Sequence, residues 1–389
     1  MTNTDFAEGL CISTPVGNLQ GGVMNTFIRG KKLAILLLSS CLSASSILAF
    51  SSPAQAAELC AKDKVYLVQS GRGLENPYYA FVNKGAEAFA KSVNLKSNWI
   101  SSEGDSQKQL SQITSIVNEH KNCAVINVDP NESAILPAIL DVAKAKGAHV
   151  IVQWNRPKGV TPKVYGDTFV AFMSENGYNQ GYGSAIALLK AMGGKGNIVA
   201  LQGILDNVPA QTRYAGLQAA LKEYPKVKLL AQQTANWDQN EAQKLTQTFL
   251  TKYGKKITGV WTANDSMGLG ALAALKAKKR TEVPVVGTDG LTQVLKLIAK
   301  GNGKSGFIAT SVPGGAVQGA IGLAIGYQAA IGTHNVATAK AEYRAFYLKT
   351  NIATKANITA TLALAEDPVP ALNFTDIWSV VGDAVPENL

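Results

Sequence analysis

Two apolar patterns alternate along the chain from Lys64 onward. Short, nearly continuous apolar runs are typical of strands that are buried on both faces of a sheet. Between them lie longer segments in which apolar residues recur every three or four positions, as in amphipathic helices. An alternation of strands and helices predicts an α/β fold in which helices cover both faces of a parallel sheet.

The first half of this pattern opens with a strand at 65–69 and a helix that starts at Pro77. Asn76 suits the N-cap of that helix, and proline suits its first position because an N–H there would lack a helical partner. The helix presents Tyr78 and Tyr79 at the carboxyl end of the strand, where open α/β sheets bind ligands. The other predicted elements are strands at 96–100, 124–128 and 148–153 and helices after Asp105 and at 135–146.

The second half repeats this order. Its predicted elements are strands at 197–201, 227–232, 259–262 and 283–287 and helices at 211–223, after Asp238 and at 269–277. Asn264 follows its strand as Asp129 does 135 residues earlier. We therefore expect two similar doubly wound parallel-sheet lobes, with a ligand cleft between their polar edges.

Composition agrees with two folded domains. The chain has 389 residues, of which 46% are hydrophobic and 16% charged, so it is long and apolar enough for two full cores. The formal net charge of +10 raises the question of an anionic partner. Because the lysines are scattered and form no dense run interleaved with aromatics, we interpret the charge as a solvated surface and expect no nucleic-acid partner.

Residues 24–56 have the order of an export signal. Arg29, Lys31 and Lys32 form a basic segment, an apolar stretch diluted by serines follows, and 54–56 is a small-x-small cleavage site. A membrane anchor is the alternative, but the serines leave no unbroken apolar span of about 20 residues. We therefore expect the mature protein to meet its ligand outside the cytoplasm.

Two further readings of this region remain open. Residues 1–23 resemble no part of the signal, so they are either an extension foreign to the natural protein or a consequence of translation that really starts at Met24. The segment 38–41 resembles a lipobox, which would make Cys41 a lipid anchor in place of cleavage after Ala56.

Cys60 and Cys123 remain after cleavage, and each immediately precedes a predicted strand. If these are the first and third strands of a doubly wound sheet, they are parallel neighbours, and both cysteines lie at the same edge. A disulfide between them is expected in an oxidising compartment, and two free buried thiols are the alternative.

Catalytic and cofactor patterns fail on inspection. His120, His149 and His334 have neither zinc spacing nor a carboxylate cluster beside them, so no metal is expected. The glycine-rich segment 301–306 follows a helix and precedes a strand, which is the reverse of a dinucleotide-binding loop. We therefore expect no catalytic residue and no cofactor.

A nicotinamide site is a remote alternative. Gly268-x-Gly270-x-x-Ala273 follows a strand and opens a helix, and Asp289 ends a later strand. However, Asn264, Asp265, Ser266 and Met267 stand between the strand and the first glycine, so the tight turn is misplaced. The glycines more simply allow close packing between helix and sheet.

Aromatic and polar residues at the strand ends suit a polyhydroxylated solute. Tyr78, Tyr79 and Trp237 would offer flat faces to the C–H patches of a sugar. The partners for its hydroxyl groups would be Asp129, Asn264 and Asp289, since carboxylates accept strongly from hydroxyl donors.

The chain resembles the periplasmic sugar-binding proteins of ABC importers, of the ribose-binding type, from Lys64 to about Phe346. The resemblance rests on the order and spacing of Asn76-Pro77-Tyr78-Tyr79, Asn127-Val128-Asp129-Pro130, Arg213-x-x-Gly216-Leu217, Asn236-Trp237-Asp238, Asn264-Asp265-x-Met267 and Gly287-Thr288-Asp289-Gly290. It implies two lobes that are joined by three crossovers and close on the ligand.

The ligand-binding residues predicted from the pattern and the resemblance together are Ser70, Asn76, Tyr78, Tyr79, Asp129, Trp154, Asn155, Arg156, Gln211, Trp237, Asn264, Asp289 and Thr310. Two departures matter. The family's Asp-Arg pair after the fourth strand is either Trp154-Asn155 or Asn155-Arg156 here, and Gln211 replaces a family arginine. The loss of strong charged donors argues against assuming a simple aldopentose or hexose, and the class of sugar stays open.

The predicted lobes are 60–174 with about 311–345 for the N-terminal lobe, and 175–310 with about 346–389 for the C-terminal lobe. The resemblance implies a monomeric, non-enzymatic periplasmic receptor that delivers a sugar or sugar-like solute to an ABC permease. A sensor that presents its closed form to a chemoreceptor or sensor kinase is the alternative.

Overall fold

The computed structural model describes residues 58–312, 314–366 and 372–386, and the predicted export signal, with Cys41, lies outside these ranges. The described residues belong to one structural unit that begins at Ala56. Within them, no helix combines the length and apolar character that a membrane span requires.

The first sheet contains seven strands and is parallel except at its last strand. In order across the sheet they are β2 (Ser97–Ser101), β1 (Tyr66–Gly71), β3 (Ala124–Val128), β4 (His149–Gln153), β5 (Phe169–Ser174), β11 (Ala345–Leu348) and β13 (Val381–Ala384). Side chains of β3 alternate between two cores: Val125 packs toward one face, and Ile126 and Val128 toward the other. Burial on both faces explains why these strands read as continuous apolar runs.

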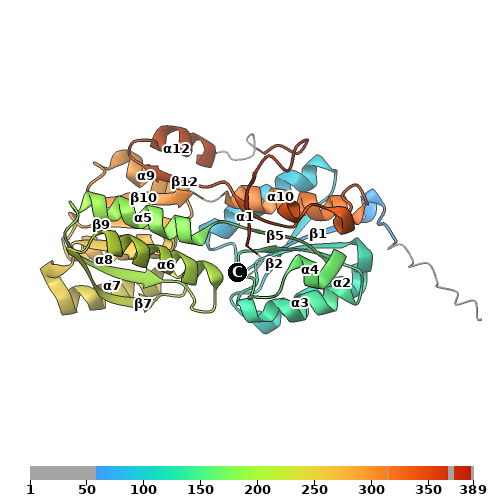
Figure 1. Cartoon of the computed structure of the whole chain (residues 1–389), viewed down its shortest axis with the longest axis horizontal. Helices are drawn as coiled ribbons and strands as arrows, with labels where there is room; N and C mark the ends of the chain where they lie inside the picture. The colour runs from blue at the N-terminus through green and yellow to red at the C-terminus, as the bar shows by residue number, and fades with distance from the viewer. Residues whose placement is uncertain (1–57, 313, 367–371, 387–389) are drawn as a thin grey trace, which may run out of the picture. The chain divides into compact units, whose positions relative to one another are not determined.

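Helices cover both faces of this sheet (Figure 1). One face packs against α1 (Pro77–Ser92) and α10 (Gly315–Ala330), and the other against α2 (Ser106–His120) and α3 (Leu136–Lys144). Two short helices, α4 (Pro162–Tyr165) and α11 (Ala341–Arg344), lie beside β5.

The second sheet contains six strands. They run in the order β7 (Val227–Thr234), β6 (Gly196–Gln202), β8 (Gly259–Thr262), β9 (Pro284–Thr288), β10 (Gly306–Val312) and β12 (Asn351–Thr354), with only β12 antiparallel to its neighbour. Its helices are α5 (Gly177–Ala191), α6 (Val208–Glu223), α7 (Gln239–Tyr253), α8 (Asp265–Ala277), α9 (Thr292–Lys300) and α12 (Ile358–Glu366).

The glycines of the nicotinamide-like motif serve close packing, although mainly between helices. A Cβ atom at Gly270 would lie 2.1 Å from the backbone oxygen of Gln239 in α7, and one at Gly268 would lie 2.6 Å from the ring of Phe307. Helix α8 also begins at Asp265 and not at Leu269, because Asn264 caps it by accepting from the backbone N–H of Met267 at 2.9 Å.

The tail corrects the predicted lobe boundaries. Residues 346–389 were expected in the C-terminal lobe, yet β11 belongs to the first sheet, β12 and α12 pack with the second, and β13 returns to pair with β11. Apolar burial stabilises the segment that leads back to the first sheet, because Ile377 is 2% exposed in the core of the first lobe. The chain therefore passes between the lobes four times, and not three times as the resemblance implied.

A disulfide joins Cys60 to Cys123, with an S–S distance of 2.02 Å and a Cα–Cα distance of 5.1 Å. The two cysteines precede β1 and β3, which are paired in parallel. The bond ties the start of the lobe to its third strand.

Removing this disulfide should lower stability because the bond closes a loop with a sequence separation of 63. Loop entropy for this length corresponds to about 4 kcal/mol of unfolding free energy. We expect a reducing agent to lower the Tm of the wild type by several degrees. A Cys60→Ser/Cys123→Ser variant should melt at the lower Tm with or without reductant. An unchanged wild-type melt under reduction would contradict this expectation.

Candidate functional site

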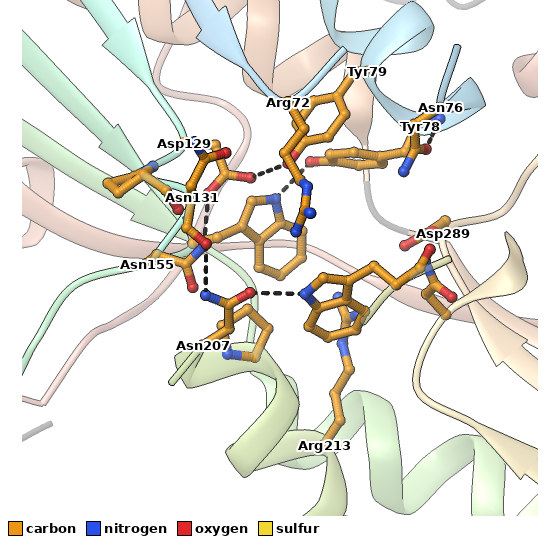
Figure 2. Close-up of a pocket in the computed structure, with 15 residues that line it drawn as sticks. Arg72, Asn76, Tyr78, Tyr79, Asp129, Asn131, Asn155, Asn207, Arg213 and Asp289 are labelled. Carbon is orange, nitrogen blue, oxygen red and sulfur yellow. Dashed lines mark hydrogen bonds between the residues drawn. The ribbon is translucent and has the colours of Figure 1, made fainter. Parts of the chain in front are cut away.

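The carboxyl ends of strands from both sheets face one cavity of about 510 Å³, measured out to its open mouth. Its lining residues are Arg72, Asn76, Tyr78, Tyr79, Asp129, Pro130, Asn131, Trp154, Asn155, Asn207, Pro209, Arg213, Trp237, Asn264 and Asp289. Figure 2 shows Asp129 and Asp289 on opposite sides of it.

Most of the predicted ligand residues meet in this cavity. They are Asn76, Tyr78, Tyr79, Asp129, Trp154, Asn155, Trp237, Asn264 and Asp289. Of the two alternative pairs after the fourth strand, Trp154-Asn155 lies wholly in the cavity lining, whereas Arg156 does not line it. Their ligand contacts remain predictions.

Ser70 and Thr310 lie outside the cavity, behind its wall. The Ser70 hydroxyl is fully buried and accepts from Nε2 of Gln109 at 3.1 Å. The Thr310 hydroxyl donates to Oδ1 of Asp265 at 2.7 Å. Both side chains bond buried polar groups and do not line the cavity.

Arg156 and Gln211 also lie outside, and they line a separate cavity. Arg156 donates to the backbone oxygen of Val160 at 3.1 Å, and its guanidinium stacks over Phe172 at 4.7 Å. Gln211 donates to the backbone oxygen of Leu205 at 2.7 Å. Their side chains are committed to local contacts.

The sequence-based set lacks Arg72, Asn131, Asn207 and Arg213, all of which line the cavity. Asn207 could have been found, because it precedes a helix with proline in its first turn, as Asn76 does. Arg213 stands in a motif that carried the resemblance but was not interpreted as a ligand residue. Arg72 has no sequence signal beyond its place in the loop after β1.

Two tryptophans form facing aromatic walls with their polar edges already paired. Nε1 of Trp154 donates to the Tyr78 hydroxyl at 2.6 Å, and Nε1 of Trp237 donates to Oδ1 of Asn207 at 2.7 Å. The Tyr78 hydroxyl also bonds Gln318. Because the N–H groups are satisfied within the protein, any contact of these indoles with a ligand would be made by their carbon surface.

The backbone is strained where these walls are attached. Trp154 has φ 55°, Trp237 has φ 64° and Asp289 has φ 133°, values that side-chain-bearing residues rarely adopt. Each such residue costs on the order of 1–3 kcal/mol and persists only where the surrounding structure enforces it. The three residues with this strained backbone carry two indoles and one carboxylate that line the same cavity.

Arg213 lies between the two indoles. Its guanidinium carbon is 4.9 Å from the ring centroid of Trp154 in the first lobe and 5.7 Å from that of Trp237 in the second. Nε donates to Gln180 at 3.0 Å and Nη1 to the backbone oxygen of Ala263 at 2.8 Å. Burial lowers the Arg213 pKa, an effect that Asp289 opposes. The cation therefore holds one aromatic wall from each lobe.

Asp129 accepts a hydrogen bond on each oxygen from its own neighbours. The Tyr79 hydroxyl donates to Oδ2 at 2.9 Å and Nδ2 of Asn155 donates to Oδ1 at 2.9 Å. Burial raises the Asp129 pKa to about 7 in spite of these bonds. Asp289, at the end of β9, also has a pKa raised by burial, with Arg213 acting in the opposite direction.

Hydrogen bonds join the lobes at the rim of the cavity. Nδ2 of Asn207 donates to the backbone oxygen of Asn131 at 3.1 Å (Figure 2). The Ser133 hydroxyl donates to the backbone oxygen of Asp206 at 2.9 Å, and the Ala134 N–H donates to the Asp206 carboxylate at 3.3 Å. The loop before α6 thus contacts the segment after β3, which is the arrangement of a closed cleft.

The family model that matches is the periplasmic binding protein domain, over residues 70–334. The chain belongs to the periplasmic binding protein family. The resemblance found in the sequence is thereby confirmed, together with the two-lobed α/β fold and the solute-binding function.

Individual relatives agree. The xylitol-binding protein of Mycolicibacterium smegmatis is 34% identical over 242 residues, which cover 62% of this chain and 66% of the relative. The D-apiose import binding protein of Actinobacillus succinogenes is 35% identical over 234 residues, covering 59% and 72%. The crystal structure of a twin-arginine translocation pathway signal protein from Burkholderia phytofirmans matches with a TM-score of 0.80 and 38% identity, covering 83% of this chain and 98% of that one.

These relatives are solute-binding proteins and not enzymes, which does not favour the nicotinamide alternative. The first crossover, between β5 and α5, contains a buried acid.

Glu175 links two crossovers. Its carboxylate accepts from Gln180 in α5 and from Nε2 of Gln318 in α10 at 3.4 Å, and from the backbone N–H of Gly314. Burial raises the Glu175 pKa to about 8, although Arg213 acts to lower it. The native protein therefore holds a proton here that the unfolded chain has lost.

This proton makes stability pH-dependent. Between the ordinary pKa of 4.5 and the folded value of about 8, the native state binds more protons than the unfolded state, so its stability falls as the pH rises. Glu175→Gln removes this titration. Denaturant titrations give the unfolding free energy of the wild type and of the variant at each pH. We expect the value for the wild type minus the value for the variant to decrease from pH 5.5 to pH 9. Glu119→Gln, an exposed control, should give a constant difference, and a constant difference for Glu175→Gln would refute the assignment.

Proposed function

We propose that this protein is an exported periplasmic receptor that captures a sugar, a polyol or a related polyhydroxylated solute and delivers it to an ABC permease. The observation that carries the proposal is the cavity between the lobes, in which two indoles and two carboxylates converge. The relatives named for xylitol and D-apiose support the same class of solute.

The chemistry of the lining supports a polyhydroxylated ligand. The faces of Trp154 and Trp237 can cover C–H surfaces. Oδ1 of Asn155 and Nδ2 of Asn131 are buried without a hydrogen-bond partner among the described residues. Buried polar atoms left unpaired cost free energy, so a ligand that pairs them gains affinity.

The closed cleft supports a role in delivering the bound solute to a permease. Ligand bound between the lobes stabilises the closed form against the open one, and the permease would recognise the closed form. The receptor acts as a monomer and catalyses nothing. Presentation of the same closed form to a chemoreceptor or sensor kinase is compatible with this geometry.

A thermal-shift screen tests the class of solute. A ligand that binds only the native state stabilises it by about 2.7 kcal/mol at 100 times its Kd. We expect at least one sugar, polyol or sugar derivative to raise the Tm, and nucleosides and amino acids to leave it unchanged. If no sugar, polyol or sugar derivative shifts the transition, the proposed class is wrong.

Substitutions in the cavity test the assigned residues. Trp237→Ala removes one aromatic wall, and Asp289→Asn removes a carboxylate from the opposite side to Asp129. Each should weaken the Kd of the solute found in the screen by at least tenfold, measured by calorimetry. Tyr178→Ala, an exposed aromatic outside the cavity, serves as control. Unchanged affinity in both cavity variants would refute the site.

A further inference from the structure

Arg72 is held rigidly at the cavity by its backbone. Its carbonyl oxygen accepts from the Ser101 hydroxyl at 2.6 Å and from the Glu103 N–H at 2.6 Å. The guanidinium packs over Gly104, where an added Cβ atom would lie 2.8 Å from Nη2. Figure 2 shows the side chain reaching into the cavity between Tyr78 and the second lobe. The backbone of Arg72 is thus fixed at the cavity, and its guanidinium lies against Gly104.

The guanidinium of Arg72 is incompletely paired within the described part of the chain. Nη1 is buried and has no hydrogen-bond partner there, and no ion pair involves the residue. Asp129 acts on Arg72 through its charge, but its oxygens accept from Tyr79 and Asn155, and no hydrogen bond joins it to Arg72. A buried cationic donor without a partner is costly.

Arg213, the other cation of the cavity, differs in this respect. Gln180 accepts from its Nε and Ala263 from its Nη1, and Asp289 supplies opposing charge. The buried Nη1 of Arg72 has no such partner among the described residues. The cationic donor left unpaired at the cavity is therefore that of Arg72.

A second unpaired donor lies on the same wall. The Ser102 hydroxyl bonds both the backbone oxygen of Gly71 at 3.0 Å and Oδ1 of Asn131 at 2.9 Å, which places the Asn131 amide beside the Arg72 loop. Nδ2 of Asn131 has no partner among the described residues. Nη1 of Arg72, which is charged, and Nδ2 of Asn131 are thus two hydrogen-bond donors without an acceptor at this wall.

Helix ends add to the positive potential. Asn76, Asn207 and Asn264 stand at the N-termini of α1, α6 and α8, and all three line the cavity. Helix N-termini carry partial positive charge. They are common to clefts at the carboxyl ends of parallel strands, so they reinforce Arg72 and do not replace it.

We infer that the ligand is a sugar acid, such as an aldonate, whose carboxylate is bound by Arg72 and Asn131 while its hydroxyl groups extend along the indoles toward Asp289. This inference rests on the proposed function and narrows its solute class. A neutral hydroxyl can accept one hydrogen bond from Arg72, but only an anion neutralises it, and carboxylates pair with guanidinium groups through two parallel bonds.

Calorimetric titration with matched pairs tests the inference. The probes are xylonate against xylitol, ribonate against ribitol and gluconate against glucitol, which differ in the carboxylate alone. For at least one pair, the acid should bind at least tenfold more tightly than the alditol. Arg72→Gln should abolish that preference while changing alditol affinity less than threefold. Arg72→Lys should keep a reduced preference, since it retains charge without the paired geometry.

Lys108→Gln is the matched control, because it removes one positive charge from the same lobe at a residue outside the cavity. It should leave the preference for the acid unchanged. The wild-type ratios decide the question even if an Arg72 variant fails to fold. If alditols or neutral sugars bind as tightly as every acid, the sugar-acid inference is wrong and the receptor function stands. If neither acids nor neutral solutes bind, both fail.

Discussion

Burial of Arg213 between the lobes is the interaction on which the closed cleft depends. A guanidinium removed from water is tolerated only when its donors are paired and its charge is opposed. Here Gln180 and Ala263 pair it within the second lobe, whereas one of its two indoles comes from the first lobe. Separation of the lobes would take Trp154 away from the cation. Closure of the two lobes therefore also brings Trp154 and Trp237 into position at the cavity.

The buried acidic residues around Arg213 lower the stability of the fold at the site where the ligand is expected to bind. Burial raises the pKa of Asp129, Glu175 and Asp265 to about 7, 8 and 7, so each ionised form is held at a cost. A core built for stability alone would place apolar residues here. The strained backbone at Trp154 and Asp289 adds to that cost. The disulfide and two extensively buried sheets supply the compensating stability.

The sequence predicted the parts of the site that follow from periodicity and capping. Asn76 and Asn264 were found because an N-cap at a strand end has a recognisable local pattern. Arg72 was missed because nothing local distinguishes a buried arginine from an exposed one. The choice between Asn155 and Arg156 depended on the left-handed turn at Trp154, which no propensity predicts. The return of β13 was missed because its side chains are mostly exposed and lack an apolar alternation.

Because the chain is synthesised from its N-terminus, α10 is made long after the strands that it covers. Strands β1 to β5 are complete at residue 174, yet the helix that covers one face of their sheet ends only at Ala330. Nearly every residue of α10 is buried in the finished lobe. While the second lobe is being made, that apolar face has only α1 to cover it. Such a surface is a target for chaperones or for misassembly. The lobe that is begun first is thus the last to acquire a closed core, and the nascent chain is most vulnerable at mid-length.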